Sequence, residues 1–274
     1  MKKIFDALFR ELESGRPAVL CAISAARGST PRGAGAKMLV LEGGRTLGTI
    51  GGGEVELQAA RRAAWLLEER RSGAEAYRLS AEGSLGMACG GEVEILFQYF
   101  APEDLDKTRT LASEEETRVF LFGGGHVAQA LSQALALAEF SVEVWDDRPG
   151  MAAKERFPDA AACRCGPYPG ALEVLPAMTE EDFVVVMTHG HQADFEVLSQ
   201  VLGTPVKYIG CIGSRGKAAA VRERLSAAGF TEEDIRRIYS PIGLPIGGKS
   251  PGEIAISVAA QLIACRSGRL EDFR

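Results

Sequence analysis

Residues 118–131 read RVFLFGGGHVAQAL, and this stretch decides the fold of the second half of the chain. The apolar run Arg118–Phe122 predicts a buried strand, which ends at three glycines and is followed by a helical pattern. The spacing Gly123-x-Gly125-x-x-Ala128 fits the strand, tight turn and helix of a dinucleotide-binding fold. There the first glycine makes the turn, the second admits a phosphate to the backbone, and the small third residue lets helix and strand pack closely.

The order of strand, polar turn and helix repeats toward the C-terminus. After a predicted helix, His126–Glu139, three more apolar runs predict the strands Ser141–Trp145, Phe183–Thr188 and Tyr208–Ile212. The last predicted helix is Pro251–Arg266, with a proline suited to its first turn. This alternation predicts an α/β domain of the Rossmann-like type, built on a doubly wound parallel sheet.

Two acidic residues stand where a dinucleotide-binding fold carries the acid that holds a ribose hydroxyl. Asp146 and Asp147 follow the second apolar run, about 20 residues after the glycines. Their position leaves NAD(P) open as a cofactor, and an NAD(P)-dependent oxidoreductase as one candidate function.

The N-terminal part of the chain has a different pattern and predicts a smaller α+β domain. Its expected elements are an amphipathic helix within residues 1–15, a strand over Ala18–Ala26, a hairpin of Lys37–Leu41 and Arg45–Ile50, a helix over Glu54–Arg71 and a strand over Glu92–Phe100. Residues 102–116 are dense in charge and show no apolar stripe, so we predict a linker there. The expected organisation is a domain over 1–101, a linker over 102–116 and the Rossmann-like domain over 117–274.

Composition and charge favour a globular protein over a nucleic-acid binder or a membrane protein. Hydrophobic residues make up 46% of the 274 residues, which supports a sizeable core. The net charge is -6, and a nucleic-acid binder usually carries a basic excess, so no nucleic-acid partner is expected. No apolar stretch reaches the length of about 18 residues that a membrane span needs. The six cysteines form no CxxC pair, which favours reduced thiols in the cytoplasm.

All three histidines lie at predicted strand ends. His126 stands in the glycine turn, and His189 and His191 belong to the sequence THGHQAD after a buried strand. A stable zinc site needs a third or fourth ligand, and few candidates exist, so no metal is expected, although a metal-dependent hydrolase stays as an alternative. Proton transfer or hydrogen bonding to a polar ligand is the favoured role.

Glycine-rich segments mark further candidate ligand contacts. Cys89 stands in GMACGG, where flanking glycines let a thiol approach a ligand closely. Gly51–Gly53 and Gly213-Ser214-Arg215 precede predicted helices, where backbone N–H groups can bind an anion. Because such turns occur in both domains, we expect an anionic ligand in a cleft between them. The candidate residues for chemistry are Cys89, His189 and His191, and those for cofactor binding are Gly51, Gly52, Gly53, Gly90, Gly91, Gly123, Gly125, His126, Asp146, Asp147, Ser214, Arg215 and Lys249.

Residues 243–250, GLPIGGKS, satisfy the pattern GxxxxGK[ST] without predicting an NTPase. A P-loop follows a core strand, and Pro241 and Pro245 break any strand here. The plain interpretation is a loop that caps the last helix. Lys249 and the helix start remain candidates for binding a phosphate group.

Taken together, several segments resemble the xanthine dehydrogenase accessory family, XdhC/CoxI. The matching strings, in the order of the family, are GSTPRGAGAKMLV, GTIGGGEVE, GMACGGEVEI, FGGGHVAQAL, DDRPG with ERFPDA, VMTHGHQAD, YIGCIGSRGK and SPIGLPIGGKSPGEIAISVAAQLI. The resemblance implies a protein that binds the molybdenum cofactor, in its molybdopterin or its dinucleotide form. It also implies that the protein assists sulfuration by a cysteine desulfurase, passes the cofactor to a molybdenum hydroxylase apoenzyme and forms a homodimer. Such a protein is an accessory factor more than a turnover enzyme, and the NAD(P)-dependent oxidoreductase is the alternative.

Overall fold

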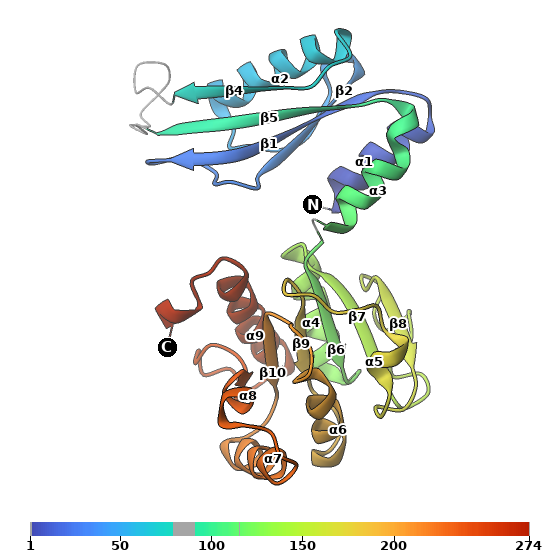
Figure 1. Cartoon of the computed structure of the whole chain (residues 1–274), viewed down its shortest axis with the longest axis vertical. Coiled ribbons are helices and arrows are strands. Elements are labelled where there is room, and N and C mark those ends of the chain that lie inside the picture. Colours follow the sequence, from blue (N-terminus) through green and yellow to red (C-terminus); the bar gives the residue numbers. More distant parts are fainter. Residues whose placement is uncertain (1, 79–90, 115, 274) are drawn as a thin grey trace. The chain divides into compact units, whose positions relative to one another are not determined.

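The computed structural model describes residues 2–78, 91–114 and 116–273. Cys89 and Gly90, which the sequence singles out, lie outside the described residues. The chain divides into two compact units, Met1–Glu116 and Thr117–Arg274 (Figure 1), and each is described by itself. Among the described residues, no helix has the length and apolar character that a membrane span requires.

Unit 1 is an antiparallel sheet in the order β3-β2-β1-β5-β4, covered by helices on both faces (Figure 1). Its strands are β1 (Ala18–Arg27), β2 (Lys37–Leu41), β3 (Thr46–Gly48), β4 (Gly73–Arg78) and β5 (Glu92–Phe100), and its helices are α1 (Lys2–Glu13), η1 (Glu42–Gly44), α2 (Gly53–Glu68), η2 (Pro102–Asp104) and α3 (Leu105–Glu114). Unit 1 has a hydrophobic core on each face of its sheet, and alternate residues of β1 point into one or the other. Val19 and Cys21 pack with α2, whereas Ala18 and Leu20 pack with α1. The predicted hairpin is confirmed, with Met38 opposite Gly48.

The interpretation of residues 102–116 as a linker is wrong, because most of this segment is helical and belongs to unit 1. Leu105, Leu111 and Ala112 of α3 pack against the core formed by α1. Thr108 lies between them on the same face, is fully buried, and donates its hydroxyl to the backbone oxygen of Asp104 at 2.9 Å. Because a polar threonine occupies a core position, the apolar residues of this helix do not form a continuous stripe in the sequence.

Unit 2 is a six-stranded parallel sheet in the order β11-β10-β9-β6-β7-β8, so the predicted Rossmann-like α/β class is confirmed. Its strands are β6 (Arg118–Phe122), β7 (Ser141–Asp146), β8 (Ala162–Cys165), β9 (Phe183–Val186), β10 (Tyr208–Cys211) and β11 (Ile238–Tyr239), and its helices are α4 (His126–Leu137), α5 (Ala171–Val174), α6 (His191–Val201), α7 (Arg215–Ala227), α8 (Glu232–Arg236), α9 (Pro251–Arg266) and η3 (Leu270–Phe273). The strand order reverses between β6 and β9. Ligands of such sheets bind at this switch point, outside the carboxyl ends of the strands.

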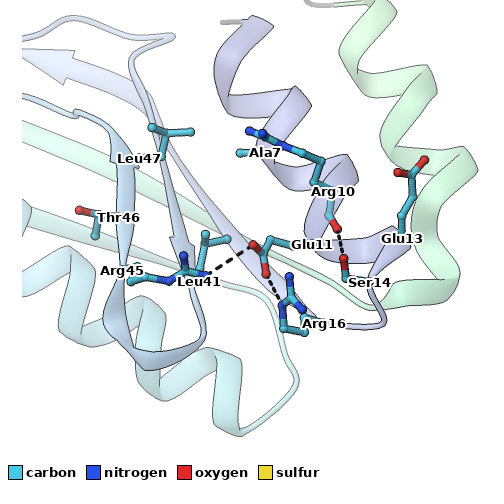
Figure 2. A pocket seen from close by; sticks show the side chains of 10 residues that line it. All are labelled: Ala7, Arg10, Glu11, Glu13, Ser14, Arg16, Leu41, Arg45, Thr46 and Leu47. Carbon is cyan, nitrogen blue, oxygen red and sulfur yellow. Dashed lines mark hydrogen bonds and ion pairs between the residues drawn. The ribbon is translucent and has the colours of Figure 1, made fainter.

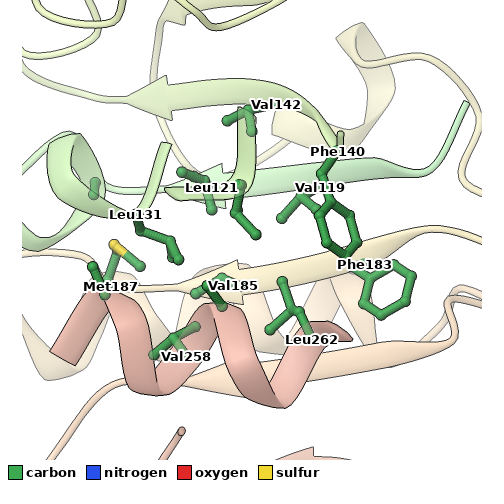
Figure 3. Close-up of a cluster of buried hydrophobic side chains, with 14 of the residues drawn as sticks. Val119, Leu121, Leu131, Phe140, Val142, Phe183, Val185, Met187, Val258 and Leu262 are labelled. Carbon is green, nitrogen blue, oxygen red and sulfur yellow. The ribbon is translucent and has the colours of Figure 1, made fainter. Parts of the chain in front are cut away.

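Two helices cover one face of this sheet and begin at the same edge. Leu131 of α4 and Val258 and Leu262 of α9 pack on Leu121 and Val185 of the central strands (Figure 3). Arg266, at the end of α9, donates to the backbone oxygen of Ala138, at the end of α4, at 3.0 Å. The two helices therefore run in the same direction, and the loop before α9 reaches the carboxyl edge of the sheet, as the glycine turn before α4 does.

Candidate functional site

The structure gathers the candidate residues of unit 2 at the carboxyl edge of the parallel sheet. His126 follows β6, Asp147 follows β7, His189 follows β9 and Ser214 follows β10. Parallel strands end at the same edge, so these residues share one region of the surface. Gly51–Gly53 and Gly91 belong to unit 1.

The three glycines after β6 have different physical roles. Gly123 has a φ of 115°, and a Cβ there would collide with the backbone oxygen of Met187. A Cβ on Gly124 would collide with the backbone oxygen of Met151. These two glycines serve close packing of the chain on itself. Gly125 is different, because apart from its own atoms and those of its two chain neighbours no described atom lies within 4 Å of the position its Cβ would take.

Asp146 binds the chain itself and is not open to a ribose. Its fully buried carboxylate accepts the N–H of Gly124 at 2.7 Å and the Nε and Nη2 of Arg148 at 2.9 and 2.8 Å. Burial alone would raise the pKa of Asp146, but the hydrogen bonds from Arg148 and Gly124 outweigh it and hold the pKa below its ordinary value. The expectation that Asp146 holds a ribose hydroxyl is therefore wrong, since its acceptors are already used.

Sequence reasoning missed a cation beside the glycine turn. Arg156 donates from Nη2 to the backbone oxygen of Gly124 at 3.1 Å. Its buried Nε has no hydrogen-bond partner in the part of the chain that the structure describes. The signal in the sequence is the string ERFPDA, which contains Arg156 and belongs to the resemblance to the family, but its spacing does not point back to the turn.

The two helices that begin at the switch point have no side-chain caps. Gly125 precedes α4 and Gly190 precedes α6, and neither helix start receives a side-chain cap from the described residues. By contrast, Ser214, Thr231 and Ser250 cap α7, α8 and α9 with their side-chain oxygens. The first N–H groups of a helix need acceptors, and the helix dipole favours an anion there. At this edge, the starts of α4 and α6 thus have the features that favour an anion.

The histidines surround these helix starts. His126 and His191 are the first residues of α4 and α6, His189 lies just before α6, and all three are exposed. Nδ1 of His189 lies 3.6 Å from Oδ1 of Asp147. Within residues 2–78, 91–114 and 116–273, no group of three or more His, Cys, Asp or Glu side chains is placed to hold a metal ion. This arrangement suits hydrogen bonding to a polar ligand.

A buried carboxylate holds the loop that carries His189. Asp194 is fully buried and accepts hydrogen bonds from the backbone N–H of Thr188 at 3.2 Å and from its hydroxyl at 2.6 Å. It also forms an ion pair with Lys217 of α7. The spacing THGHQAD therefore includes a residue that fixes the loop, in addition to the two exposed histidines.

In unit 1, the turn at Gly51–Gly53 holds one of the chain's own carboxylates. Glu56 accepts hydrogen bonds from the Thr49 hydroxyl at 2.5 Å and from the N–H groups of Ile50 and Gly52 at 2.9 and 3.0 Å. Burial alone would raise the pKa of Glu56, but these hydrogen bonds hold it below the ordinary value of 4.5. The structure differs from the expectation here, because the N–H of Gly52 goes to Glu56 and the N–H of Gly51 goes to Oγ1 of Thr49 at 3.1 Å.

Replacing Glu56 by glutamine is expected to lower the free energy of unfolding at pH 7 by about 1 to 2 kcal/mol. Since the folded pKa of Glu56 is lowered, its contribution is fully present above the ordinary pKa of 4.5 and is lost as the pH falls below it. Urea unfolding of both proteins at pH 7 and pH 3.5 measures this, and the difference should shrink at pH 3.5. A difference that is the same at both values would show that the charge of Glu56 has no part in it.

The remaining candidates have structural contacts of their own. Oγ of Ser214 accepts the N–H of Lys217 at 3.3 Å, and the side chain of Arg215 is outside the description. Lys249 and Ser250 both donate their backbone N–H groups to Glu253 at 2.9 Å, so these two groups cap α9 and are not open to a phosphate. The side chain of Lys249 is exposed, and its contact with a phosphate stays a prediction. Gly91 is buried, and a Cβ there would collide with the backbone oxygen of Ser29.

A pocket of about 620 Å³ in unit 1 lies apart from these residues (Figure 2). Its charges largely pair with one another. Figure 2 shows Glu11 between Arg16, at 2.6 Å, and Arg45, at 3.5 Å. The hydrogen bond from Arg16 is the main cause of the lowered pKa of Glu11. The pocket lining includes none of the candidate residues.

The fold and the site define a Rossmann-like domain, joined to a smaller α+β unit, whose switch point presents uncapped helix starts and histidines. The sequence model described as the XdhC Rossmann domain matches residues 119–262, and that of the XdhC and CoxI family matches residues 11–78. The chain belongs to the XdhC family.

Relatives support this placement across the whole chain. YqeB of Escherichia coli strain K12 is 30% identical over 267 residues, which cover 96% of this chain and 46% of YqeB, so the chain spans about half the length of that relative. The molybdenum cofactor insertion chaperone PaoD of the same organism is 24% identical, with 95% of this chain and 87% of PaoD covered. A crystal structure from Bacillus halodurans, described as a xanthine dehydrogenase, has a TM-score of 0.77 and 25% identity, and the match covers 97% of this chain and 96% of that one.

Proposed function

We propose that this protein is a maturation factor for molybdenum hydroxylases, which binds the molybdenum cofactor as cargo and delivers it to the apoenzyme. The observation that carries the proposal is the pair of uncapped helix starts at the switch point, with all three histidines of the chain beside them. A relative of similar extent is named a molybdenum cofactor insertion chaperone.

The chemistry of the cargo suits this edge of the sheet. The cofactor ends in a phosphate or, in its dinucleotide form, carries a pyrophosphate, and either group is a preferred partner for the N–H groups of a helix start. Gly125 leaves the backbone open to such a group. A carrier must also release its cargo, and exposed histidines offer hydrogen bonds that can be exchanged for those of a partner.

The proposal includes partners and a place of action. A cysteine desulfurase would supply the sulfur, the hydroxylase apoenzyme would receive the sulfurated cofactor, and the protein would act as a homodimer in the cytoplasm. Two of the free cysteines among the described residues, Cys21 and Cys211, are buried, which raises the pKa of each thiol to about 12, so neither offers a reactive thiolate for this chemistry.

Co-expression under anaerobic conditions with a molybdenum hydroxylase tests the proposal. The purified full-length protein is expected to carry a pterin, identified by mass spectrometry, together with molybdenum. The loaded protein should activate hydroxylase apoenzyme, and more so when the cysteine desulfurase was present during expression. A protein that carries no pterin and activates no apoenzyme would overturn the proposal.

Cys89→Ser is expected to abolish delivery of sulfurated cofactor. The sequence places Cys89 between Gly86 and two further glycines, which give a thiol access to a ligand, and soft sulfur suits a molybdenum centre. Hydroxylase activation and molybdenum content measure the effect, with Cys163→Ser and Cys165→Ser of β8 as controls that should match the wild type. Normal delivery by the Cys89 variant would leave the histidines as the candidates for this chemistry.

A further inference from the structure

The pocket of unit 1 has a lining in which cations outnumber acids. Its cations are Arg10, Arg16 and Arg45, and its acids are Glu11 and Glu13. The chain as a whole has the opposite sign, with a net charge of -6. A concave surface lined by an excess of positive charge raises the local concentration of anions.

Glu11 holds two of these arginines in place. Its side chain is 11% exposed, with Oε2 at 2.6 Å from Nε of Arg16 and Oε1 at 3.5 Å from Nη2 of Arg45. In Figure 2 the carboxylate lies between the two guanidinium groups. The hydrogen bond from Arg16 lowers the pKa of Glu11 most, and the charges of Arg45 and Arg10 add to the effect. Glu11 is therefore ionised at neutral pH and orders both arginines before any ligand binds.

The contacts with Glu11 use only part of what the arginines can donate. Arg16 reaches Glu11 through Nε, so its two Nη groups keep an edge that suits a second oxyanion. Among the described residues, the side chain of Arg45 forms the ion pair at 3.5 Å and no hydrogen bond. Both side chains are accessible, with 45% of Arg16 and 67% of Arg45 exposed.

The other acids nearby do not cancel the positive charge. Glu13 is shared with Arg109, a further cation outside the lining, at 3.9 Å. Glu42 interacts electrostatically with Arg16 but is not part of the lining. With Arg109 and Glu42 included, the arginines still outnumber the glutamates.

Apolar side chains complete the lining and indicate what else the ligand carries. They are Ala7, Leu41 and Leu47, and Leu47 is 37% exposed. An inorganic ion gains nothing from such contacts, whereas an organic group buries apolar surface on them. The volume of about 620 Å³ lies within the range of about 300–1,000 Å³ that is usual for small-molecule sites.

We propose that this pocket binds a small organic anion, with Arg16 and Arg45 donating to its carboxylate or phosphate group and with Leu41 and Leu47 contacting its apolar part. Planar guanidinium groups bind either acidic group through paired N–H donors. The site is additional to the helix starts of unit 2, and the inference does not depend on the proposed function.

Isothermal titration calorimetry of the full-length protein tests the proposal with phenyl phosphate, benzoate and the neutral benzyl alcohol. At low ionic strength, the wild type is expected to bind at least one of the two anions with a Kd of about 1 mM or lower, and to bind benzyl alcohol much more weakly. The anion that binds more tightly identifies the acidic group of the ligand.

Arg45→Ala is expected to weaken binding of that anion at least about tenfold, because it removes a charged donor from the pocket. The fold should stay intact, since an exposed ion pair adds little to stability. Arg78→Ala is the matched control, because Arg78 is an exposed arginine of the same unit with an ion pair of 3.8 Å to Glu92. The control should bind like the wild type.

Modification of arginines by phenylglyoxal, mapped by mass spectrometry, locates the bound anion. At about ten times its Kd, the anion should slow the modification of Arg16 and Arg45 roughly tenfold. Arg78, which is 88% exposed, should react at an unchanged rate. The proposal is overturned if neither anion binds, if benzyl alcohol binds as tightly, if Arg45→Ala binds like the wild type, or if Arg78 is protected to the same extent.

Discussion

Asp146→Ala is expected to lower the free energy of unfolding of unit 2 by roughly 3 kcal/mol. The buried carboxylate accepts one hydrogen bond from Gly124 and three from Arg148, and its removal leaves all of these donors without their acceptor. The guanidinium of Arg148 is 41% exposed, so water can take over part of its solvation. For that reason the expected loss lies at the lower end of the range for breaking a buried ion pair.

Urea unfolding followed by the fluorescence of Trp145, which is 5% exposed and precedes Asp146, measures this loss. Asp146→Asn keeps an acceptor for the N–H of Gly124 and should recover part of the stability. Asp159→Ala, at an exposed position, should change the stability by no more than about 0.5 kcal/mol. If Asp146→Ala behaves like Asp159→Ala, the carboxylate does not hold the glycine turn.

Pattern alone sufficed for central strands of the two sheets. The predicted run Arg118–Phe122 coincides with β6, and the predicted strand Glu92–Phe100 coincides with β5, because the apolar residues of a central strand are dense or alternate strictly. The edge strands β4 and β8 escaped prediction for the opposite reason. In β4 only Tyr77 is buried, and β8 has no fully buried residue, so neither carries a clear hydrophobic pattern.

The candidate site was predictable as a region but not as a set of contacts. The glycine turn and the histidines were found because they follow predicted parallel strands, whose ends must share an edge. Spacing does not reveal whether an acid near a glycine turn binds a ligand or the turn itself. Glu56, Asp146 and Glu253 all accept N–H groups of glycine-rich turns within their own chain. The turns at Gly51–Gly53 and before α9 therefore bind acids of the chain itself, whereas at the turn after β6 Asp146 takes the N–H of Gly124 and leaves the start of α4 without a side-chain cap.

The glycine turn after β6 offers a pair of substitutions that separate architecture from ligand binding. Gly123→Ala is expected to destabilise unit 2 by about 2 kcal/mol or more, because a φ of 115° is unfavourable for any other residue and the new Cβ would meet Met187. Gly125 has a φ of -72° and open space around its Cβ position, so a side chain there introduces no strain.

Gly125→Val is therefore expected to fold normally and to lose cofactor binding by about 100-fold. The isopropyl group would occupy the space through which a phosphate reaches the N–H groups at the start of α4, and two hydrogen bonds to a charged group account for a loss of this size. Molybdenum and pterin retained after co-expression measure the effect, and a thermal unfolding curve confirms the fold. Gly252→Val, at an exposed glycine in the first turn of α9, is the control and should retain the cofactor. If a folded Gly125→Val protein retains as much cofactor as the wild type, the phosphate binds elsewhere. Among the described residues, the start of α6 at Gly190 would then be the remaining uncapped helix start at the switch point.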